Sequence, residues 1–201
     1  MKKIMMTLAA VAMAATMNAQ TYIGGGIGFN NSKNPHGNTE TTETGFRIAP
    51  EVGYNLDEKW AVGIALDFGY EKDKTEDKAS NISSETKTTT FKVKPYARYQ
   101  ALQWGKANIF VDGGVNFGIS KPEDYKAGLD LGLFITPGVA FNVSDKWSIV
   151  AKLNDMFTLG YSKGSVPDVP NAPDAPTSFE AGLSTGGFNL GSLTFGVYYN
   201  F

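Results

Sequence analysis

Nine charged residues occupy alternate positions in segments that otherwise alternate apolar and small residues. They are Arg47, Glu51, Asp67, Lys92, Lys94, Arg98, Asp112, Asp130 and Lys152. Five are positive and four are negative, so the set is close to neutral. If these side chains are enclosed together they must form ion pairs, because an isolated buried charge is strongly unfavourable. We interpret them as a structural charge network; on the wet face of a soluble sheet, the alternative, they would need no partners.

The sequence offers little for catalysis or cofactor binding. His36 is the single histidine, and no Cys is present. Hydrolytic and acyl-transfer chemistry usually needs a His beside a Ser, Asp or Glu, and no nucleophile motif surrounds His36. Residues 24–29 do not match the dinucleotide-binding glycine pattern, because residue 29 is Phe. The mixed-charge stretch 71–78 could offer Asp73, Glu76 and Asp77 to Ca²⁺ but lacks the spacing of a Ca²⁺ site. We therefore predict no catalytic residues, cofactors or metals.

The first 19 residues predict a secretory signal peptide. Lys2 and Lys3 precede an apolar stretch, and Ala19 is a small residue at the expected cleavage position. We expect a single mature domain of residues 20–201, with cleavage after Gln20 as the alternative, and the absence of Cys excludes a lipoprotein anchor. Removal of both lysines changes the formal charge from −2 to −4. The mature chain thus has no basic excess for nucleic acid, and it has no apolar run of about 18 residues for a membrane helix.

Alternation with a period of two recurs along the chain and predicts β-strands. In residues 60–70, for example, every even-numbered residue is apolar, whereas Asp67 and small residues occupy the odd positions. Eight segments follow this pattern: residues 22–30, 46–54, 60–70, 91–99, 109–119, 129–143, 147–161 and 193–201. Pro50, Pro95 and Pro137 lie inside them, and because Pro cannot donate a ladder hydrogen bond, the pairing beside them stays open.

The predicted connections alternate in length. Those after the second, fourth and sixth strands are short: residues 55–59, 101–106 and 144–146. Those after the odd-numbered strands are longer: residues 31–44, 72–88, 120–127 and 162–186. Short connections favour adjacent antiparallel strands. Short turns at one end and long loops at the other are the layout of a transmembrane β-barrel.

The apolar strand faces fit two architectures. A secreted β-sandwich or lectin-like domain would bury them against a second sheet, whereas a membrane barrel would turn them to lipid. Aromatic residues gather at the strand ends, as in a membrane girdle, and aliphatic residues fill the middles. The predicted girdle at the short-turn end contains Tyr54, Trp60, Tyr99, Phe141 and Trp147. The hydrocarbon core of a membrane also requires a closed sheet, because unpaired backbone groups are unfavourable there. The first and last strands are both long and alternating, so they could pair and close the sheet.

The signal peptide, the rhythm of connections and the ending FGVYYNF resemble those of small outer-membrane β-barrel proteins of the OmpA/OmpX type. These occur in Gram-negative bacteria, and the residues around the cleavage site are similar to those of Bacteroidetes. The resemblance implies an all-β, eight-stranded antiparallel up-and-down transmembrane barrel with both termini in the periplasm. It also implies a monomer whose partners are outer-membrane lipid, lipopolysaccharide and the barrel-assembly machinery. The assembly signal carried over to this sequence is Leu193, Phe195, Val197, Tyr199 and Phe201.

An eight-stranded barrel is just wide enough for side chains to fill its interior. Bulky residues that would point inward are Lys92, Lys94, Tyr96, Arg98, Phe134, Lys152 and Tyr198. We therefore expect a filled lumen and a structural or surface-display role, in which long external loops mediate adhesion to an unidentified ligand. A narrow channel or small-ligand binder is the alternative, because glycines 24, 25, 26 and 28 could leave space, and a barrel enzyme ranks lower. Prolines 167, 170, 173 and 176 would line one edge of a polyproline II segment, either a partner ligand or a stiff loop.

Overall fold

The computed structural model describes residues 20–37, 39–78, 80, 82–153, 156–169, 173–183 and 193–201. The predicted signal peptide of residues 1–19 lies outside this set, as do Asn154 and Asp155 in the predicted seventh strand. All regular elements in the described residues are β-strands. None of these residues belongs to a helix long and apolar enough to cross a membrane.

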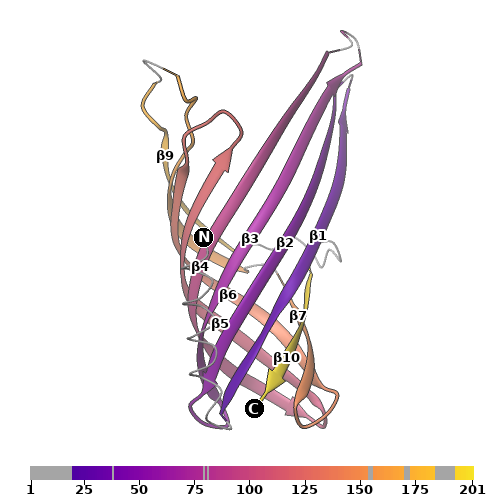
Figure 1. Ribbon diagram of the computed structural model, residues 1–201, viewed down its shortest axis with the longest axis vertical. Helices are drawn as coiled ribbons and strands as arrows, with labels where there is room; N and C mark the ends of the chain where they lie inside the picture. The colour runs from indigo at the N-terminus through magenta and orange to yellow at the C-terminus, as the bar shows by residue number, and fades with distance from the viewer. Residues whose placement is uncertain are drawn as a thin grey trace, which may run out of the picture.

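The strands form one antiparallel sheet. They are β1 (Thr21–His36), β2 (Thr39–Asn55), β3 (Trp60–Asp77), β4 (Ile82–Trp104), β5 (Ala107–Pro122), β6 (Gly128–Asn142), β7 (Trp147–Lys152), β8 (Phe157–Lys163), β9 (Thr177–Leu183) and β10 (Thr194–Asn200). These ten segments occupy eight positions, because β7 and β8 both pair with β6 and their respective outer neighbours are β10 and β9. Figure 1 shows the strands side by side around the barrel.

The barrel closes where the first and last strands meet. β10 pairs with β1 from Tyr22–Asn200 to Ile27–Phe195, and its other edge pairs with β7. The Phe201 N–H also donates to the Thr21 carbonyl oxygen at 3.1 Å. The C-terminus therefore lies within the wall at the short-turn end (Figure 1). The predicted eight-stranded antiparallel barrel is confirmed.

The three prolines inside the strands interrupt one ladder each. At Pro50, Pro95 and Pro137 the residue pairs with one neighbouring strand are interrupted, while the pairs with the neighbouring strand on the other side continue. This is expected, because a proline lacks the N–H that the interrupted ladder would use. The skip beside Pro137 coincides with the break between β7 and β8, where the Leu153 N–H donates to the Pro137 carbonyl oxygen at 3.0 Å.

Two of the predicted external loops are mostly strand. Residues 31–44 belong largely to a hairpin that carries β1 to His36 and begins β2 at Thr39. Residues 72–88 belong largely to a second hairpin, between β3 and β4. Both project beyond the rest of the barrel at its upper end (Figure 1). The loop prediction was wrong because both faces of these hairpins are polar, which removes the apolar period that marks a half-buried strand.

Two further predicted connections also contain strand. The strand β9 lies within the predicted loop 162–186, and β4 continues through the predicted turn 101–106 to Trp104. The tight turn that follows uses Gly105, whose φ of 58° is readily adopted by glycine. The ladder between β4 and β5 is irregular between Gln100 and Leu102. Such a bulge inserts one residue and shifts the alternation of side chains. A strict period of two therefore does not detect the end of this strand.

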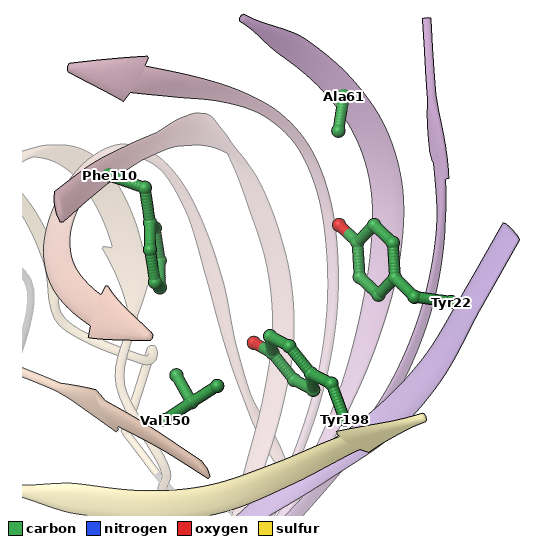
Figure 2. Packing of buried hydrophobic residues seen from close by; sticks show 5 residues of the cluster. All are labelled: Tyr22, Ala61, Phe110, Val150 and Tyr198. Atoms are coloured by element: carbon green, nitrogen blue, oxygen red, sulfur yellow. The ribbon is translucent and has the colours of Figure 1, made fainter. Parts of the chain in front are cut away.

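The two faces of the sheet are reversed relative to a soluble protein. On the outer face, Ile27 is 61% exposed and Ile149 is 52% exposed, whereas inside the barrel Arg98 is 5% exposed and Asp112 is 2% exposed. Figure 2 shows the only apolar cluster of buried residues among those described, in which rings from opposite parts of the wall point towards the axis. A sandwich core would require the opposite arrangement. The apolar faces therefore surround the barrel.

Candidate functional site

A compact ion-pair network fills the lower lumen, nearer the short turns. Arg98 Nε donates to Asp112 Oδ1 at 2.6 Å, and its Nη2 donates to Asp112 Oδ2 at 2.9 Å and Glu51 Oε1 at 3.2 Å. Lys152 Nζ lies 2.6 Å from Glu51 Oε2 and 3.1 Å from Asp112 Oδ2. Two cations thus face two carboxylates, so the network is neutral, and its charge-assisted bonds compensate the burial of its charges.

Four aromatic rings surround the Arg98 guanidinium. Its central carbon lies 4.0 Å from the Phe110 centroid and 5.1 to 5.4 Å from the centroids of Tyr198, Tyr96 and Tyr22. Three of these rings are labelled in Figure 2. Hydroxyl groups join the rings to the charges, since Tyr96 Oη donates to Glu51 Oε1 at 3.0 Å and Arg98 Nη2 donates to Tyr198 Oη at 3.1 Å. We call these four rings with Arg98, Glu51, Asp112 and Lys152 the plug.

Each ring of the plug lies against a glycine of a neighbouring strand. The pairs are Tyr22 with Gly53, Tyr96 with Gly63, Phe110 with Gly138 and Tyr198 with Gly24. A Cβ atom on any of these glycines would come within 3.0 Å of the ring. The inward glycines thus make room for the rings, and in the first strand Gly24 packs against Tyr198. The signal that sequence reasoning missed is this cross-strand pairing of glycine with an aromatic residue.

A second group of charges lies towards the long-loop end. Arg47 donates two hydrogen bonds to the carboxylate of Asp67, from Nε at 2.7 Å and from Nη2. Lys92 Nζ lies 3.4 Å from Asp130 Oδ1, which also accepts a hydrogen bond from Asn116. The Lys94 ammonium lies 3.9 Å above the centre of the Phe134 ring. All nine charged residues singled out from the sequence thus line the inner wall, divided between the plug and this upper group.

The upper charges border open space. A cavity of about 370 Å³ lies on the long-loop side of the Arg47–Asp67 pair, and a smaller one of about 60 Å³ separates that pair from the plug. The larger cavity, which we call the vestibule, falls within the range of small-molecule sites. About a third of the side chains of Arg47, Lys92 and Asp130 is exposed, so they present charge to it. The lumen therefore combines a closed lower part with a polar, hollow upper part.

Aromatic side chains form a band on the outer face near the short turns. The five residues of the predicted girdle are 37% to 50% exposed there, and the rings of Trp60 and Tyr99 are 4.9 Å apart. Tyr199 contacts Trp147 at 5.0 Å and Phe201 at 4.9 Å between centroids. Trp104 is 85% exposed at the end of β4, and it is not among the predicted girdle residues because the sequence pattern places it in the turn 101–106.

The residues of the predicted assembly signal follow the outer face of the last strand. Phe195 and Val197 are about half exposed on β10, with Tyr199 further along the same face. Leu193 precedes the first residue of β10 and Phe201 follows the last. The described part of the sequence thus presents this row to the surroundings of the barrel.

The sequence features considered for chemistry remain apart. His36 is the last residue of β1, at an exposed hairpin tip. Residues 71–77 of the mixed-charge stretch belong to β3 and therefore alternate between the two faces of the sheet, which separates Asp73 from Glu76. Within the described ranges, no group of three or more His, Asp or Glu residues could hold a metal ion.

Comparisons with known proteins agree with this architecture. The family model described as "Outer membrane protein beta-barrel domain" matches residues 4–201. The solved structure of the outer membrane protein OprG from Pseudomonas aeruginosa is similar, with 10% identity, a TM-score of 0.52, and coverage of 90% of this chain and 94% of OprG. Neisserial surface protein A is also similar, with 12% identity, a TM-score of 0.44, and coverage of 92% and 98%. No curated protein matches the chain.

The low identity to OprG supports the fold alone, whereas the family match spans nearly the whole sequence. An apolar outer face, a charged interior and a closed antiparallel sheet are the physical requirements of a membrane barrel. The chain therefore belongs to the outer-membrane-protein β-barrel domain family, and its location is the outer membrane.

Proposed function

We propose that this protein is a non-enzymatic, monomeric outer-membrane barrel that anchors and displays its external hairpins and does not act as an open pore. The observation that carries the proposal is the plug, in which Arg98 is held by two carboxylates and four rings. An eight-stranded barrel leaves little room beside such side chains. Ions crossing the lumen would have to displace a network in which all members except Lys152 are almost completely buried.

Planar-bilayer recording on the refolded protein tests the plug. We expect no large, stable conductance from the native protein, because the ring and ion-pair layer closes the lumen. A variant with Tyr22, Phe110 and Tyr198 all changed to alanine should conduct, provided that its heat-modifiable migration on gels shows a folded barrel. A large, voltage-independent conductance of the native protein would show that the lumen is open.

The assembly machinery is a proposed partner, with Phe201 as part of its recognition signal and both termini in the periplasm. The support is the row of outward apolar residues on β10 and the N–H of Phe201 that is bonded within the wall. We expect Phe201→Ser to reduce the amount of barrel in the outer-membrane fraction strongly. Phe179→Ser is the matched control, because Phe179 is 72% exposed on β9 and does not belong to the terminal row. Equal effects of the two changes would argue against a terminal signal.

Lipid headgroups and lipopolysaccharide are proposed partners of the outer face. Beyond the outward aromatic residues of β3 and β4, the alternation of side chains along these strands places lysines on the outward side of the long hairpins. Lys72 and Lys87 are direct cross-strand neighbours there. Like charges in this position repel, and although Glu85 contacts both, an anionic headgroup would relieve the repulsion further.

The loop between β8 and β9 is proposed as a stiff part of the displayed surface. The Lys126 N–H donates to the Val166 carbonyl oxygen at 2.8 Å, and the Asp168 N–H donates to the Asp124 carbonyl oxygen at 3.0 Å. These bonds tie it to the loop between β5 and β6. Pro170, one of the four regularly spaced prolines, lies outside the described residues. Deletion of residues 166–176 with unchanged adhesion would limit this loop to a structural role.

A further inference from the structure

The inner face of the two long hairpins carries negative charge. Strands β1 to β4 project together beyond the rest of the barrel (Figure 1), and alternation continues their inner face upward from the wall of the vestibule. Glu43, Glu71 and Asp73 lie on this face beyond Arg47. Among the described residues of these strands, no Lys or Arg lies there with them, because alternation turns the hairpin lysines outward. We call this part of the sheet, with its three acids, the acidic face.

The outward acids of the same strands all have lysine partners. The ion pairs are Glu40 with Lys33 and Lys78, Glu76 with Lys74, and Glu85 with Lys72 and Lys87. By contrast, none of the three acids of the acidic face forms an ion pair with a described residue. The sheet therefore compensates its outward carboxylates internally, whereas the acidic face keeps a net negative charge.

The three acids of the acidic face repel one another. Glu43 and Asp73 are direct cross-strand neighbours, an unfavourable arrangement for like charges. Asp73 Oδ1 is enclosed and accepts no hydrogen bond from the described residues, and Glu43 Oε2 accepts one from the neutral Ser32 hydroxyl at 3.0 Å. Beyond Tyr70, the last outward aromatic residue of β3, partial burial and repulsion from Asp73 and Glu43 raise the pKa of the Glu71 carboxyl. A cationic partner would relieve this repulsion and supply the missing donor.

The vestibule adds a second acidic wall below this face. Glu180 on β9 lines the vestibule together with Glu71 on β3, and Glu180 forms no ion pair with a described residue. The two ion pairs of the upper group are neutral. The remaining charged side chains that line the vestibule are Lys94, Glu71 and Glu180, so its negative charge exceeds its positive charge. The negative charge of the hairpins thus continues into the mouth of the lumen.

We propose that the acidic face and the mouth of the vestibule dock a basic, extended peptide segment of an external protein. Inward positions on a strand repeat every second residue, about 6.8 Å apart, and an extended peptide presents alternate side chains at the same interval. Lys or Arg at alternate positions therefore meets Asp73 and Glu71 in turn, and the next cation enters the vestibule between Glu71 and Glu180. Charge complementarity selects this occupant, because the same acids repel an acidic or phosphorylated segment. The inference rests on the proposed display of the hairpins and names the chemistry that they bind.

Calorimetric titration of the refolded full-length barrel in nonionic detergent micelles tests the chemistry of the partner. The probes have equal charge: the alternating peptide acetyl-Lys-Ala-Lys-Ala-Lys-amide, the block peptide acetyl-Lys-Lys-Lys-Ala-Ala-amide, and the free polyamine spermidine. We expect saturable binding of the alternating peptide and about fivefold weaker binding of the block peptide, whose middle lysine points away from the sheet. No saturable binding of the alternating peptide, or equal binding of the two peptides, would overturn the proposal. Equally tight binding of spermidine would overturn it in favour of a small polyamine.

Two double variants of equal charge locate the site. Glu71→Gln with Asp73→Asn should weaken binding of the alternating peptide by about tenfold. Because these acids repel each other, the variant should fold as the native barrel does, which heat-modifiable migration on gels checks. Glu76→Gln with Glu85→Gln removes the same charge from the outward side of the same strands and should leave binding unchanged. Equal losses in both double variants would refute the acidic face as the site.

Failure of this partner and failure of the proposed display are distinguishable. Labelling of Lys72 and Lys87 on intact cells with a membrane-impermeant amine reagent, read by mass spectrometry, reports the display of the hairpins. Labelled hairpins on a barrel that does not bind the alternating peptide would refute the docking site and leave the display function intact. Unlabelled hairpins would overturn the display function, and the external partner with it.

Discussion

Replacement of Arg98 by methionine is expected to lower the free energy of unfolding by about 3–5 kcal/mol, the usual effect of breaking a buried ion pair. Arg98 supplies both bonds to Asp112 and one to Glu51, and all three side chains are nearly inaccessible. Without the guanidinium, Lys152 alone must serve two buried carboxylates. Its ammonium lies 5.9 Å from the centroid of the Phe110 ring, whereas the guanidinium carbon of Arg98 lies 4.0 Å from it, so Lys152 cannot replace the planar contact of Arg98.

Urea unfolding in lipid vesicles, followed by tryptophan fluorescence, measures this effect. Lys92→Met is the control, and because its pair with Asp130 is about one-third exposed, solvent screening limits the expected loss to below about 1 kcal/mol. The double variant Arg98→Met with Asp112→Leu should recover much of the stability, since it leaves Glu51 paired with Lys152. An Arg98→Met protein as stable as Lys92→Met would mean that the plug does not hold the barrel together.

The second large effect is expected at the seam that closes the barrel. Gly196→Val should destabilise the folded barrel by at least about 1–3 kcal/mol, the usual range for overpacking. A Cβ atom at Gly196 would lie 3.0 Å from the Gly25 carbonyl carbon, 3.1 Å from Gly26 Cα, and closer still to the Gly25 oxygen. These are backbone atoms, so β10 and β1 must separate to admit the side chain. The described ladder between them has six residue pairs, which leaves little pairing to absorb the shift.

Heat-modifiable migration and urea midpoints of the refolded protein measure this loss. Gly113→Val is the matched control, because the nearest atom to a Cβ there is 4.0 Å away and valine suits a lipid-facing strand. The control should keep the native midpoint. If Gly196→Val unfolded at the native midpoint as well, the close approach of the two terminal strands would not be a requirement for closure.

Patterns local to a strand determined the fold class from the sequence alone. In an alternating strand such as residues 60–70, the apolar side chains lie on one face and Asp67 lies on the other, independently of which strands pair with it. The order of short and long connections then indicated an antiparallel barrel, and the balance of charge indicated an enclosed network. The polar hairpins beyond residue 30 of β1 and residue 70 of β3 escaped this reasoning, because without an apolar face a strand has no detectable period. The strand β9 and the end of β4 escaped it as well.

The tertiary structure alone decided which side chains meet. The register and tilt of the strands bring Arg98, Glu51 and Lys152 together from β4, β2 and β7, although 101 positions separate Glu51 from Lys152 in the chain. The same geometry separates this plug from the vestibule and sets each ring opposite a glycine. Sequence alternation states the face on which a residue lies but not its height or its neighbours across the lumen. Those depend on how a closed sheet staggers its strands, so the pairing of charges and the cavity above them could be known only from the folded barrel.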